Sequence, residues 1–332
     1  MEKNKNIFHG KMKWIVVIGI VAAVIAAVLL IFAMMDEAKV KVEKKVVKLD
    51  VGQSRDIEIK AVEKNKALPK MEYSSSNNSV ATVNEKGEIF SKRGGECTIS
   101  AKTPRGQKLK VKVLVKAPKE KKVMYLTFDD GPSSAVTGKV LDVLDKYKAK
   151  ATFFVIGKSA EEVPDTLSDI ISKGHTVGIH SYSQDYNKIY KTAKSYIDDF
   201  DKTEKIIKKA GYEPKYWRFP GGGSNDFVLE EAQEKIMDEL HKRGYTEMDW
   251  NSNISDGSGN SYDAKKLFEL GVRSINATIL TGDSPVVLLH DSNMQPYTAK
   301  ALDSLLKYYK KKGYKFKGLN EYSGPELSFG KN

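Results

Sequence analysis

The stretch VMYLTFDDGP, residues 123–132, starts as an apolar run and ends in two adjacent carboxylates followed by Gly-Pro. A short apolar run of this kind, closed by a turn signal, is typical of a buried strand. On a regular strand Asp129 and Asp130 would point to opposite sides. Both can therefore face one pocket only if the chain turns, and Gly131-Pro132 supplies the turn.

Strand-like segments recur after this stretch, namely ATFFVIG, TVGIHSY, YWRFPGG, YTEMDWN, PVVLLHDS and YKFKGLNEY. Amphipathic patterns between them predict helices over VLDVLDKY and over residues 160–173, 192–210, 227–243, 262–277 and 296–312. Strands separated by helices of this length predict a parallel sheet. We therefore expect an α/β domain at 123–322, a distorted or incomplete β/α barrel, followed by a tail at 323–332.

The segment before this domain has a different pattern. Residues 39–117 alternate apolar and polar side chains in short runs separated by Gly-, Asn- and Ser-rich turns, which predicts a small all-β sandwich. Residues 118–122 form a charged linker. Cys97 is the one cysteine of the chain, so no intrachain disulfide can form, and its strand-like surroundings predict a small buried side chain.

Residues 15–35 are 21 consecutive apolar residues or glycines. A helix of that length spans roughly 30 Å, the thickness of a bilayer core. Because lysines precede the run, we expect a cytoplasmic N-terminus at 1–13, an uncleaved transmembrane anchor at 14–35, and a catalytic domain outside the cell. A cleaved signal peptide is the alternative, although FAMMDEA offers no clear cleavage site.

The net charge of +12 is unevenly distributed. Residues 36–122 carry 22 basic and 12 acidic side chains, whereas residues 123–332 carry 29 and 30. The β segment is thus the basic module, which suggests an anionic partner or else a lysine-rich surface that only aids solubility.

Polar residues gather where the predicted strands of the α/β domain end. These positions are Asp129-Asp130, His180, Arg218, Asp256 and His290. In a β/α barrel the carboxyl ends of the strands share one face, so these side chains should meet there. Carboxylates, imidazoles and a guanidinium in one pocket are suited to metal-assisted hydrolysis.

The segment 123–320 resembles the polysaccharide deacetylases of carbohydrate esterase family 4. The resemblance rests on five motifs in the family's order, namely TFDDGP at 127–132, HSYSQ at 180–184, WRFPGG at 217–222, DWNSNISDG at 249–257 and LLH at 288–290. It implies a distorted β/α barrel that removes acetyl groups from acetylated sugars. By this resemblance Asp129 is the general base, Arg218 pairs with it, His290 is the general acid, and Asp256 supports that histidine.

The same resemblance implies a divalent metal, zinc as the expected ion, held by Asp130, His180 and the residue at 184. Here that residue is glutamine, where the family normally has histidine. The ion could bind through the Gln184 amide oxygen with lower affinity, or through two protein ligands and water with help from Asp185. The site could also have lost its metal. An amide oxygen is a weaker zinc ligand than an imidazole.

Four further residues are expected to contact the substrate. The backbone N–H of Gly221 corresponds to an oxyanion donor, and Leu288 to the wall of the acetyl-methyl pocket. Tyr182 and Trp250 could offer apolar surface to a sugar ring, with core packing an equal alternative. Gly257 departs from the Trp that many relatives have at that place, which affects substrate contact rather than the chemistry.

The β segment resembles a bacterial immunoglobulin-like module of group 2, on the residues VVKLDVGQS, YSSSNNSVATVNEKGEIFSKRGG and CTISAK. Such modules are spacers or adhesive units. We therefore expect a membrane-anchored deacetylase acting on a cell-wall glycan, foremost N-acetylglucosamine in peptidoglycan, with anionic wall polymers near the basic module and no nucleic-acid partner. A catalytically weak or silent glycan-binding protein is the alternative, and a xylan or chitooligosaccharide deacetylase is a third reading.

Overall fold

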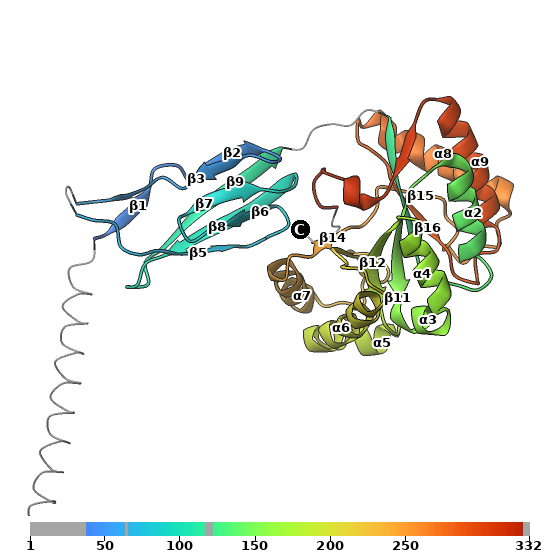
Figure 1. The fold of residues 1–332 in the computed structure, drawn as a ribbon, viewed down its shortest axis with the longest axis horizontal. Helices are drawn as coiled ribbons and strands as arrows, with labels where there is room; N and C mark the ends of the chain where they lie inside the picture. The colour runs from blue at the N-terminus through green and yellow to red at the C-terminus, as the bar shows by residue number, and fades with distance from the viewer. Residues whose placement is uncertain (1–37, 64–65, 117–121, 328–332) are drawn as a thin grey trace, which may run out of the picture.

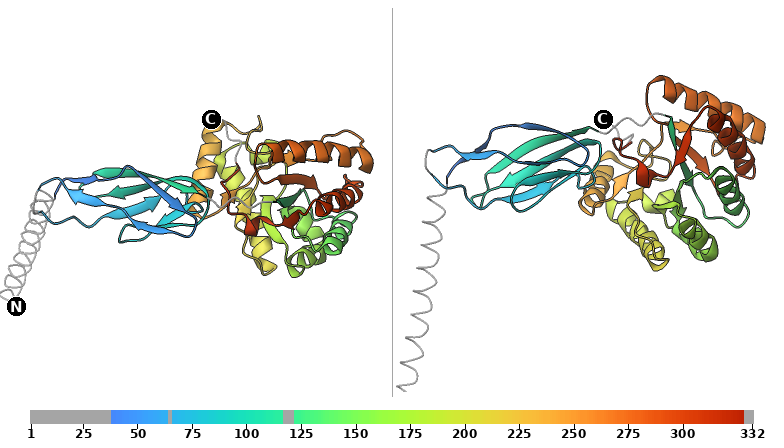
Figure 2. Two further views of the ribbon diagram at one scale, coloured as in Figure 1. Left: turned by 90° about the horizontal axis from the view of Figure 1, so that it is seen from above. Right: turned by 45° about the horizontal axis from the view of Figure 1, so that its top comes forward.

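The computed structural model describes residues 38–63, 66–116 and 122–327. They form an N-terminal β domain and a larger α/β domain that lie side by side (Figures 1 and 2). The predicted anchor at 14–35 and most of the linker lie outside the described residues. None of the helices in the described residues could span a bilayer.

The β domain consists of two main sheets that share one core. Val47, Ile89, Ile99 and Val113 are buried together between them, and Cys97 is buried as expected. Alternating burial along β9 follows its alternating sequence KLKVKVLVK. The four-stranded sheet has the order β2 (Val46–Asp50), β9 (Lys108–Lys116), β8 (Gly95–Lys102), β5 (Glu72–Ser75). The three-stranded sheet has the order β3 (Ser54–Asp56), β7 (Glu88–Ser91), β6 (Ala81–Val83), and β1 (Val40–Val42) pairs with β4 (Ile59–Ala61).

The α/β domain is built on a curled, parallel half-barrel, which confirms the predicted parallel sheet. Its described strands follow the order β14 (Thr246–Glu247), β13 (Tyr216–Trp217), β12 (Thr176–Ser181), β11 (Thr152–Ile156), β10 (Val123–Asp129), β16 (Val286–His290), β15 (Ser252–Asn253), and β17 (Lys315–Lys317) pairs with β10. The opening stretch VMYLTFD is therefore the central strand β10, and every one of its residues is buried.

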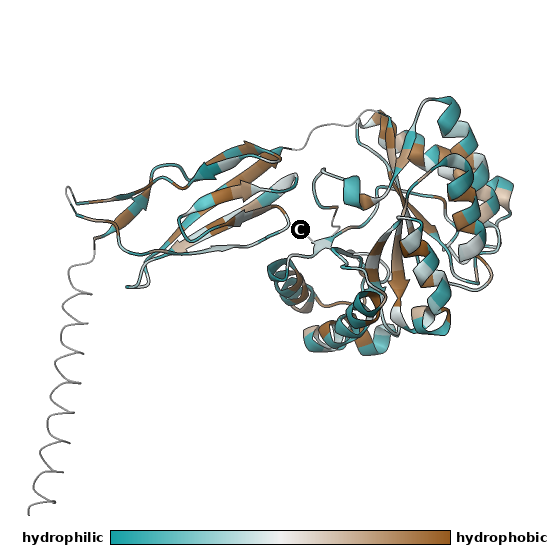
Figure 3. Ribbon diagram, viewed as in Figure 1, coloured by the Kyte–Doolittle hydropathy of each residue, from teal (hydrophilic) through white to brown (hydrophobic). Residues whose placement is uncertain are grey.

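Helices cover the outside of this sheet, and Figure 3 shows hydrophobic strands beneath helices whose outer faces are largely hydrophilic. They are α2 (Thr137–Tyr147), α3 (Gly157–Glu162), α4 (Pro164–Ser172), α5 (Tyr186–Ile189), α6 (Ala193–Lys209), α7 (Glu230–Lys242), α8 (Ala264–Leu280) and α9 (Thr298–Lys311).

Two predictions about these elements were wrong in detail. The single helix expected at 160–173 is two helices, because Pro164 cannot continue α3 and instead begins α4. The expected strand YTEMDWN is ordered as strand only at Thr246–Glu247. The chain then crosses the open side of the half-barrel, and β15 pairs with β16 at the other edge of the sheet.

The two faces of β10 have different neighbours. Met124, Leu126 and Phe128 join the large core between the sheet and the helices. Val123 and Tyr125 belong to a smaller core cluster in the interior of the half-barrel. Since side chains alternate along a strand, Asp129 continues the interior row and ends at the carboxyl rim of the sheet.

Candidate active site

Asp129 is fixed by the Arg218 guanidinium. Arg218 Nη1 donates to Asp129 Oδ1 at 2.8 Å and to the Thr127 hydroxyl at 3.0 Å. Arg218 is fully buried, and its guanidinium lies over the rings of Phe154 and Trp250 at 4.2 and 5.4 Å from the ring centroids. The structure therefore brings together the predicted base, its predicted partner and Trp250.

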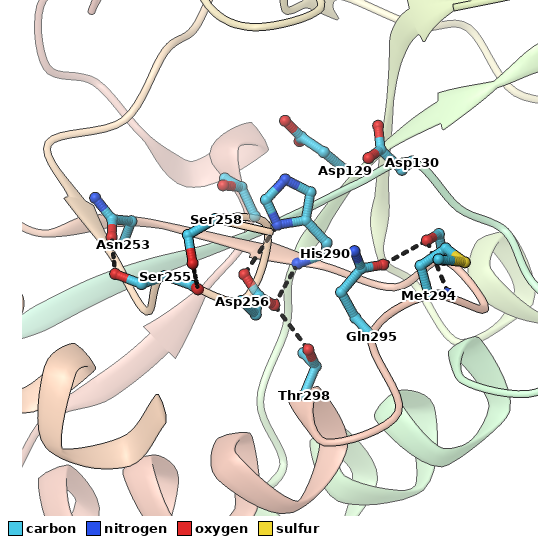
Figure 4. A network of polar contacts seen from close by, with 12 residues as sticks. Asp129, Asp130, Asn253, Ser255, Asp256, Ser258, His290, Met294, Gln295 and Thr298 are labelled. Carbon is cyan, nitrogen blue, oxygen red and sulfur yellow. Dashed lines mark hydrogen bonds and ion pairs between the residues drawn. The ribbon is translucent and has the colours of Figure 1, made fainter. Parts of the chain in front are cut away.

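Asp130 leaves the strand in a left-handed conformation, with φ +71°. Such a conformation is costly for a residue other than glycine, and it is found most often at functional sites. The carboxylates of Asp129 and Asp130 both lie near His290 in Figure 4. The chain thus turns where the sequence suggested, although the turn begins at Asp130 itself.

His180 is buried at the end of β12 with both ring nitrogens engaged. Its Nδ1–H donates to the Arg218 carbonyl at 3.0 Å, which leaves Nε2 facing Asp130 Oδ1 at 3.3 Å. Burial lowers the pKa of His180, but the nearby carboxylates of Asp129 and Asp130 raise it above its ordinary value. An imidazole held at Nδ1 by a carbonyl presents Nε2 in a fixed direction, as metal-binding histidines do.

Gln184 reaches the same carboxylate. Its amide Nε2 donates to Asp130 Oδ1 at 2.5 Å, and its backbone is left-handed with φ +52°. Burial raises the pKa of Asp130, but hydrogen bonds from His180 and Gln184 and the charges of His180 and His290 hold it below its usual range. The residue at 184 therefore belongs to the site and is not part of an unrelated loop.

The loop that carries Gln184 is held by Asp199, a residue that the sequence analysis missed. The Asp199 carboxylate on α6 accepts hydrogen bonds from the Ser181 and Ser183 hydroxyls and from the backbone N–H groups of Tyr182 and Ser183. Nothing in the local pattern of α6 distinguishes this aspartate from its solvent-exposed neighbours. Only the fold places it beneath the loop.

The Asp130, His180 and Gln184 side chains fit a divalent ion with a weakened third ligand. Among the residues described, no group of three His, Cys, Asp or Glu side chains could hold a metal, because the third side chain here is an amide. Rotating the Gln184 amide by half a turn exchanges NH2 for the carbonyl oxygen. That oxygen, a carboxylate and an imidazole form a donor set that zinc and similar ions accept.

His290 lies at the end of β16 and is held by Asp256. Its Nδ1 lies 2.9 Å from Asp256 Oδ1, and its backbone N–H donates to Oδ2 at 2.9 Å (Figure 4). The Thr298 hydroxyl, which was not predicted, donates to the same Oδ2 at 2.7 Å. Burial lowers the pKa of His290, but the Asp256 hydrogen bond and carboxylate charges raise it to about 9.

Gly257 and Gly221 both permit close contacts in the site. A Cβ at Gly257 would collide with the His290 ring, lying 2.8 Å from Nε2. Gly221 has φ +80°, and a Cβ there would lie 3.2 Å from the Tyr186 hydroxyl. Tyr186 was not predicted, and it places an aromatic ring next to the backbone of the expected oxyanion donor.

The other three residues predicted to contact the substrate lie in different places. Leu288 is nearly buried on β16 beside Thr127 of β10. Tyr182 lies between α3 and α6, where its hydroxyl donates to Glu161 and its ring lies 5.4 Å from Lys202 Nζ. The structure thus places Tyr182 against the outer helices, whereas Trp250 packs on Arg218.

Asp291 is a further buried acid next to the site. Its carboxylate accepts a hydrogen bond from the Thr137 hydroxyl at 2.6 Å and lies directly against Gly131. Burial raises the pKa of Asp291 to about 7, and the charges of Asp130 and Asp129 act in the same direction. Asp291 N–H also donates to the Asp129 carbonyl at 3.1 Å, so this residue links β16 to the turn after β10.

Residues 116–239 match the family described as polysaccharide deacetylase. A peptidoglycan-N-acetylglucosamine deacetylase from Bacillus cereus is 32% identical over 215 residues, which is 64% of this chain and 74% of that protein. The deacetylase of the same description from Listeria monocytogenes is 34% identical over 235 residues, 67% of this chain but only 43% of that longer protein.

A solved structure agrees with these matches. The catalytic domain of a peptidoglycan N-acetylglucosamine deacetylase from Eubacterium rectale is 32% identical, covers 64% of this chain and 94% of that one, and superimposes with a TM-score of 0.57. The residues matched by the family, 116–239, include Asp129, His180 and Arg218 of the site described above. The chain therefore belongs to the polysaccharide deacetylase family.

Proposed function

We propose that this protein removes the acetyl group from N-acetylglucosamine in peptidoglycan. The strongest support is that a candidate base and a candidate acid lie together at the carboxyl ends of the strands. They are the Asp129 carboxylate, bound to Arg218, and the His290 imidazole, bound to Asp256. A base and an acid facing one pocket are what amide hydrolysis requires. The substrates of the relatives from Bacillus cereus and Listeria monocytogenes support the choice of glycan.

In the proposed reaction Asp129 accepts a proton from the attacking water. Arg218 occupies one oxygen of that carboxylate, so the other oxygen is directed to the water. The tetrahedral oxyanion needs donors at the place where its charge develops, and the Gly221 backbone N–H is the proposed donor. Leu288 would border the acetyl methyl group, and Trp250 would keep the Arg218 guanidinium in place.

His290 then gives a proton to the leaving amine. With its pKa raised to about 9 the imidazole is charged at neutral pH, so the proton is present before the reaction starts. Asp256 accepts from Nδ1, which fixes the ring with Nε2 toward the pocket. Asp130, His180 and Gln184 would hold a divalent ion, zinc being the expected one, which when bound would polarise the acetyl carbonyl.

The rest of the chain suits an enzyme at the cell wall. We propose that residues 14–35 anchor the protein in the membrane with the catalytic domain outside the cell, and that the β domain is an immunoglobulin-like module. The excess of basic over acidic residues in 36–122 favours contact with anionic wall polymers. No nucleic-acid partner is proposed.

One observation favours a second candidate, a weak or silent glycan-binding protein. The Gln184 amide is hydrogen-bonded to Asp130, so an ion must compete with an existing contact. A deacetylase of xylan or chitooligosaccharides is a third candidate that keeps the same chemistry and changes only the glycan.

Acetate release distinguishes these candidates. The purified protein, supplied with zinc, cobalt or manganese in turn, is incubated with peptidoglycan, acetylated xylan and N-acetylglucosamine oligomers. We expect release from peptidoglycan, with new glucosamine rather than muramic acid in muropeptides obtained by enzymatic digestion of the product, and no release by Asp129→Asn. Binding to peptidoglycan without acetate from any glycan would support the silent protein instead.

A further inference from the structure

Arg93 of the β domain is inserted into the α/β domain. Its side chain is 5% exposed, although it starts from the loop between β7 and β8. Its Nε donates to the Gly324 carbonyl at 3.0 Å, and Nη2 lies 2.8 Å from the Met248 sulfur. The guanidinium also lies 5.8 and 5.2 Å from the ring centroids of Tyr216 and Tyr322.

Neighbouring contacts fasten the two domains at the same place. Gly94 N–H donates to the Ser323 carbonyl at 3.0 Å, and Asn77 Nδ2 donates to Glu326 Oε2 at 3.0 Å. The other oxygen of Glu326 lies 2.9 Å from His241 Nε2 at the end of α7. The segment after β17 is thus held between the β domain and α7, which lie next to each other in Figures 1 and 2.

The place that Arg93 occupies is the amino-terminal end of the barrel interior. Tyr216 and Tyr322 are packed against the interior core cluster that includes Tyr125, near the start of β10. The Tyr125 and Tyr322 rings are in edge contact at 4.9 Å. Asp129 and His290 lie at the opposite, carboxyl ends of their strands. Arg93 therefore closes the end of the half-barrel opposite the candidate active site.

Met248 connects this closed end to the site. Its side chain contacts Arg93, and its carbonyl accepts a hydrogen bond from Arg218 Nε at 2.6 Å. Arg218 Nη2 donates to the next carbonyl, that of Asp249, at 2.9 Å, and Nη1 donates to Asp129. A continuous line of contacts thus runs from Arg93 through Met248 and Arg218 to the proposed base.

We propose that Arg93 is a positioning residue for the deacetylation, and that the β domain is part of the catalytic unit. Arg93 holds the Met248–Asp249 segment, and this segment supplies two of the carbonyls that orient the Arg218 guanidinium. The kinetic part of this inference rests on the proposed function. The structural part, that Arg93 restrains the Met248–Asp249 backbone through its contact with the Met248 sulfur, does not depend on the activity.

Lysine should not replace Arg93. The guanidinium is planar, reaches two acceptors in different directions and faces two aromatic rings at once. The lysine ammonium group lacks both the fixed set of N–H donors and the planar surface of a guanidinium. The adjacent Lys92 is exposed and has the same charge, so Lys92→Ala is a matched control that removes a cation without disturbing the contact line.

The test compares full-length Arg93→Ala, Arg93→Lys and Lys92→Ala on peptidoglycan. For both Arg93 variants we expect kcat to fall by about tenfold or more with KM changed less than twofold, because the misplaced Arg218 affects the reaction and not the binding. Added guanidinium ion should restore part of kcat in Arg93→Ala only. Lys92→Ala should match the wild type. Unchanged kcat in folded Arg93→Ala and Arg93→Lys would overturn the positioning role.

Amide hydrogen exchange separates this inference from the proposed function, since it needs no substrate. The Met248 and Asp249 amides donate to the Trp217 and Leu327 carbonyls, so both should be protected in the wild type. We expect faster exchange at these two amides in the Arg93 variants and none of this change in Lys92→Ala. If the wild type releases acetate from no glycan, the proposed function fails, and equal exchange rates in all variants would overturn the inference independently.

Discussion

His180 and His290 lie on either side of β10 in the sheet order, and their Nδ1 atoms have different partners. The Nδ1 of His180 donates to a neutral backbone carbonyl, that of Arg218, whereas the Nδ1 of His290 faces the Asp256 carboxylate. A carbonyl fixes the ring without requiring a charge, and a carboxylate stabilises the imidazolium. We call Asp130, His180 and Gln184 the His180 side, and Asp256, Gly257 and His290 the His290 side. In this site the expected metal ligand has a neutral carbonyl at Nδ1, and the expected proton donor has a carboxylate there.

Removing the proton donor should have the largest effect. We expect His290→Ala to lower kcat by about 10²- to 10⁴-fold, the range that general acid catalysis contributes, while metal content stays unchanged. His180→Ala should instead lose bound metal together with activity. Steady-state kinetics and elemental analysis of both purified variants check this. Equal metal loss in both variants would show that metal binding and proton donation are not separated between the His180 side and the His290 side.

Removing the Asp256 carboxylate, which contacts His290 Nδ1, should change the pH dependence of kcat. His290 must be protonated to act, so wild-type kcat should fall as the pH rises through about 9. In Asp256→Asn the pKa of His290 should return toward its ordinary value of about 6.5, and the fall in kcat should begin there. At pH 8 this change in protonation alone lowers kcat by about 30-fold. Profiles of kcat from pH 5 to 10 provide the measurement, and an unshifted alkaline limb would contradict the assigned role of Asp256.

The zinc affinity of the His180 side should depend on the residue at position 184. In Gln184→His we expect the affinity for zinc to rise by at least about tenfold, because imidazole replaces a neutral amide oxygen. Gln184→Leu, which has no donor atom, should bind more weakly than the wild type. Competition with a coloured chelator gives the three dissociation constants. If all three agree, position 184 does not contribute to the ion site.

The smallest effect is expected from a single methyl group on the His290 side. In Gly257→Ala the new Cβ would collide with the His290 ring, so the imidazole must shift and kcat should fall by about fivefold. Gly138→Ala is the matched control, since nothing lies within 4 Å of its added Cβ in α2. That control should retain full kcat and gain about 0.5–1 kcal/mol in unfolding free energy. A fully active Gly257→Ala would show that the ring position is not critical.

Much of this arrangement can be predicted from the amino-acid sequence, because it depends on short-range patterns. Apolar runs between amphipathic helices imply a parallel sheet, and the carboxyl ends of such strands must share a rim. That reasoning brings Asp129, His180 and His290 together before any coordinates are known. The chemistry of these side chains then restricts the reaction, since carboxylates and imidazoles at one rim are suited to hydrolysis.

Sequence patterns do not identify residues that act through a distant segment. Asp199 on α6 and Thr298 at the start of α9 have no distinguishing neighbours in sequence, yet they hold the Gln184 loop and Asp256. Tyr182, predicted either to contact a sugar ring or to pack in the core, lies between α3 and α6. Its place depends on how two helices pack against β12, and periodicity within one segment does not contain that information.

The amino-acid sequence is enough to predict the parallel sheet, the all-β pattern before it and the residue types at the strand ends, because these follow from the spacing of neighbouring side chains. Only the folded chain shows that Gln184 contacts Asp130, that Asp199 holds the Gln184 loop, and that Arg93 of one domain contacts Met248 of the other. The physical reason is that hydrogen bonds and packing between distant segments depend on the complete fold. The neighbours of a residue in sequence indicate its secondary structure, but they do not identify the residues that it contacts in the fold.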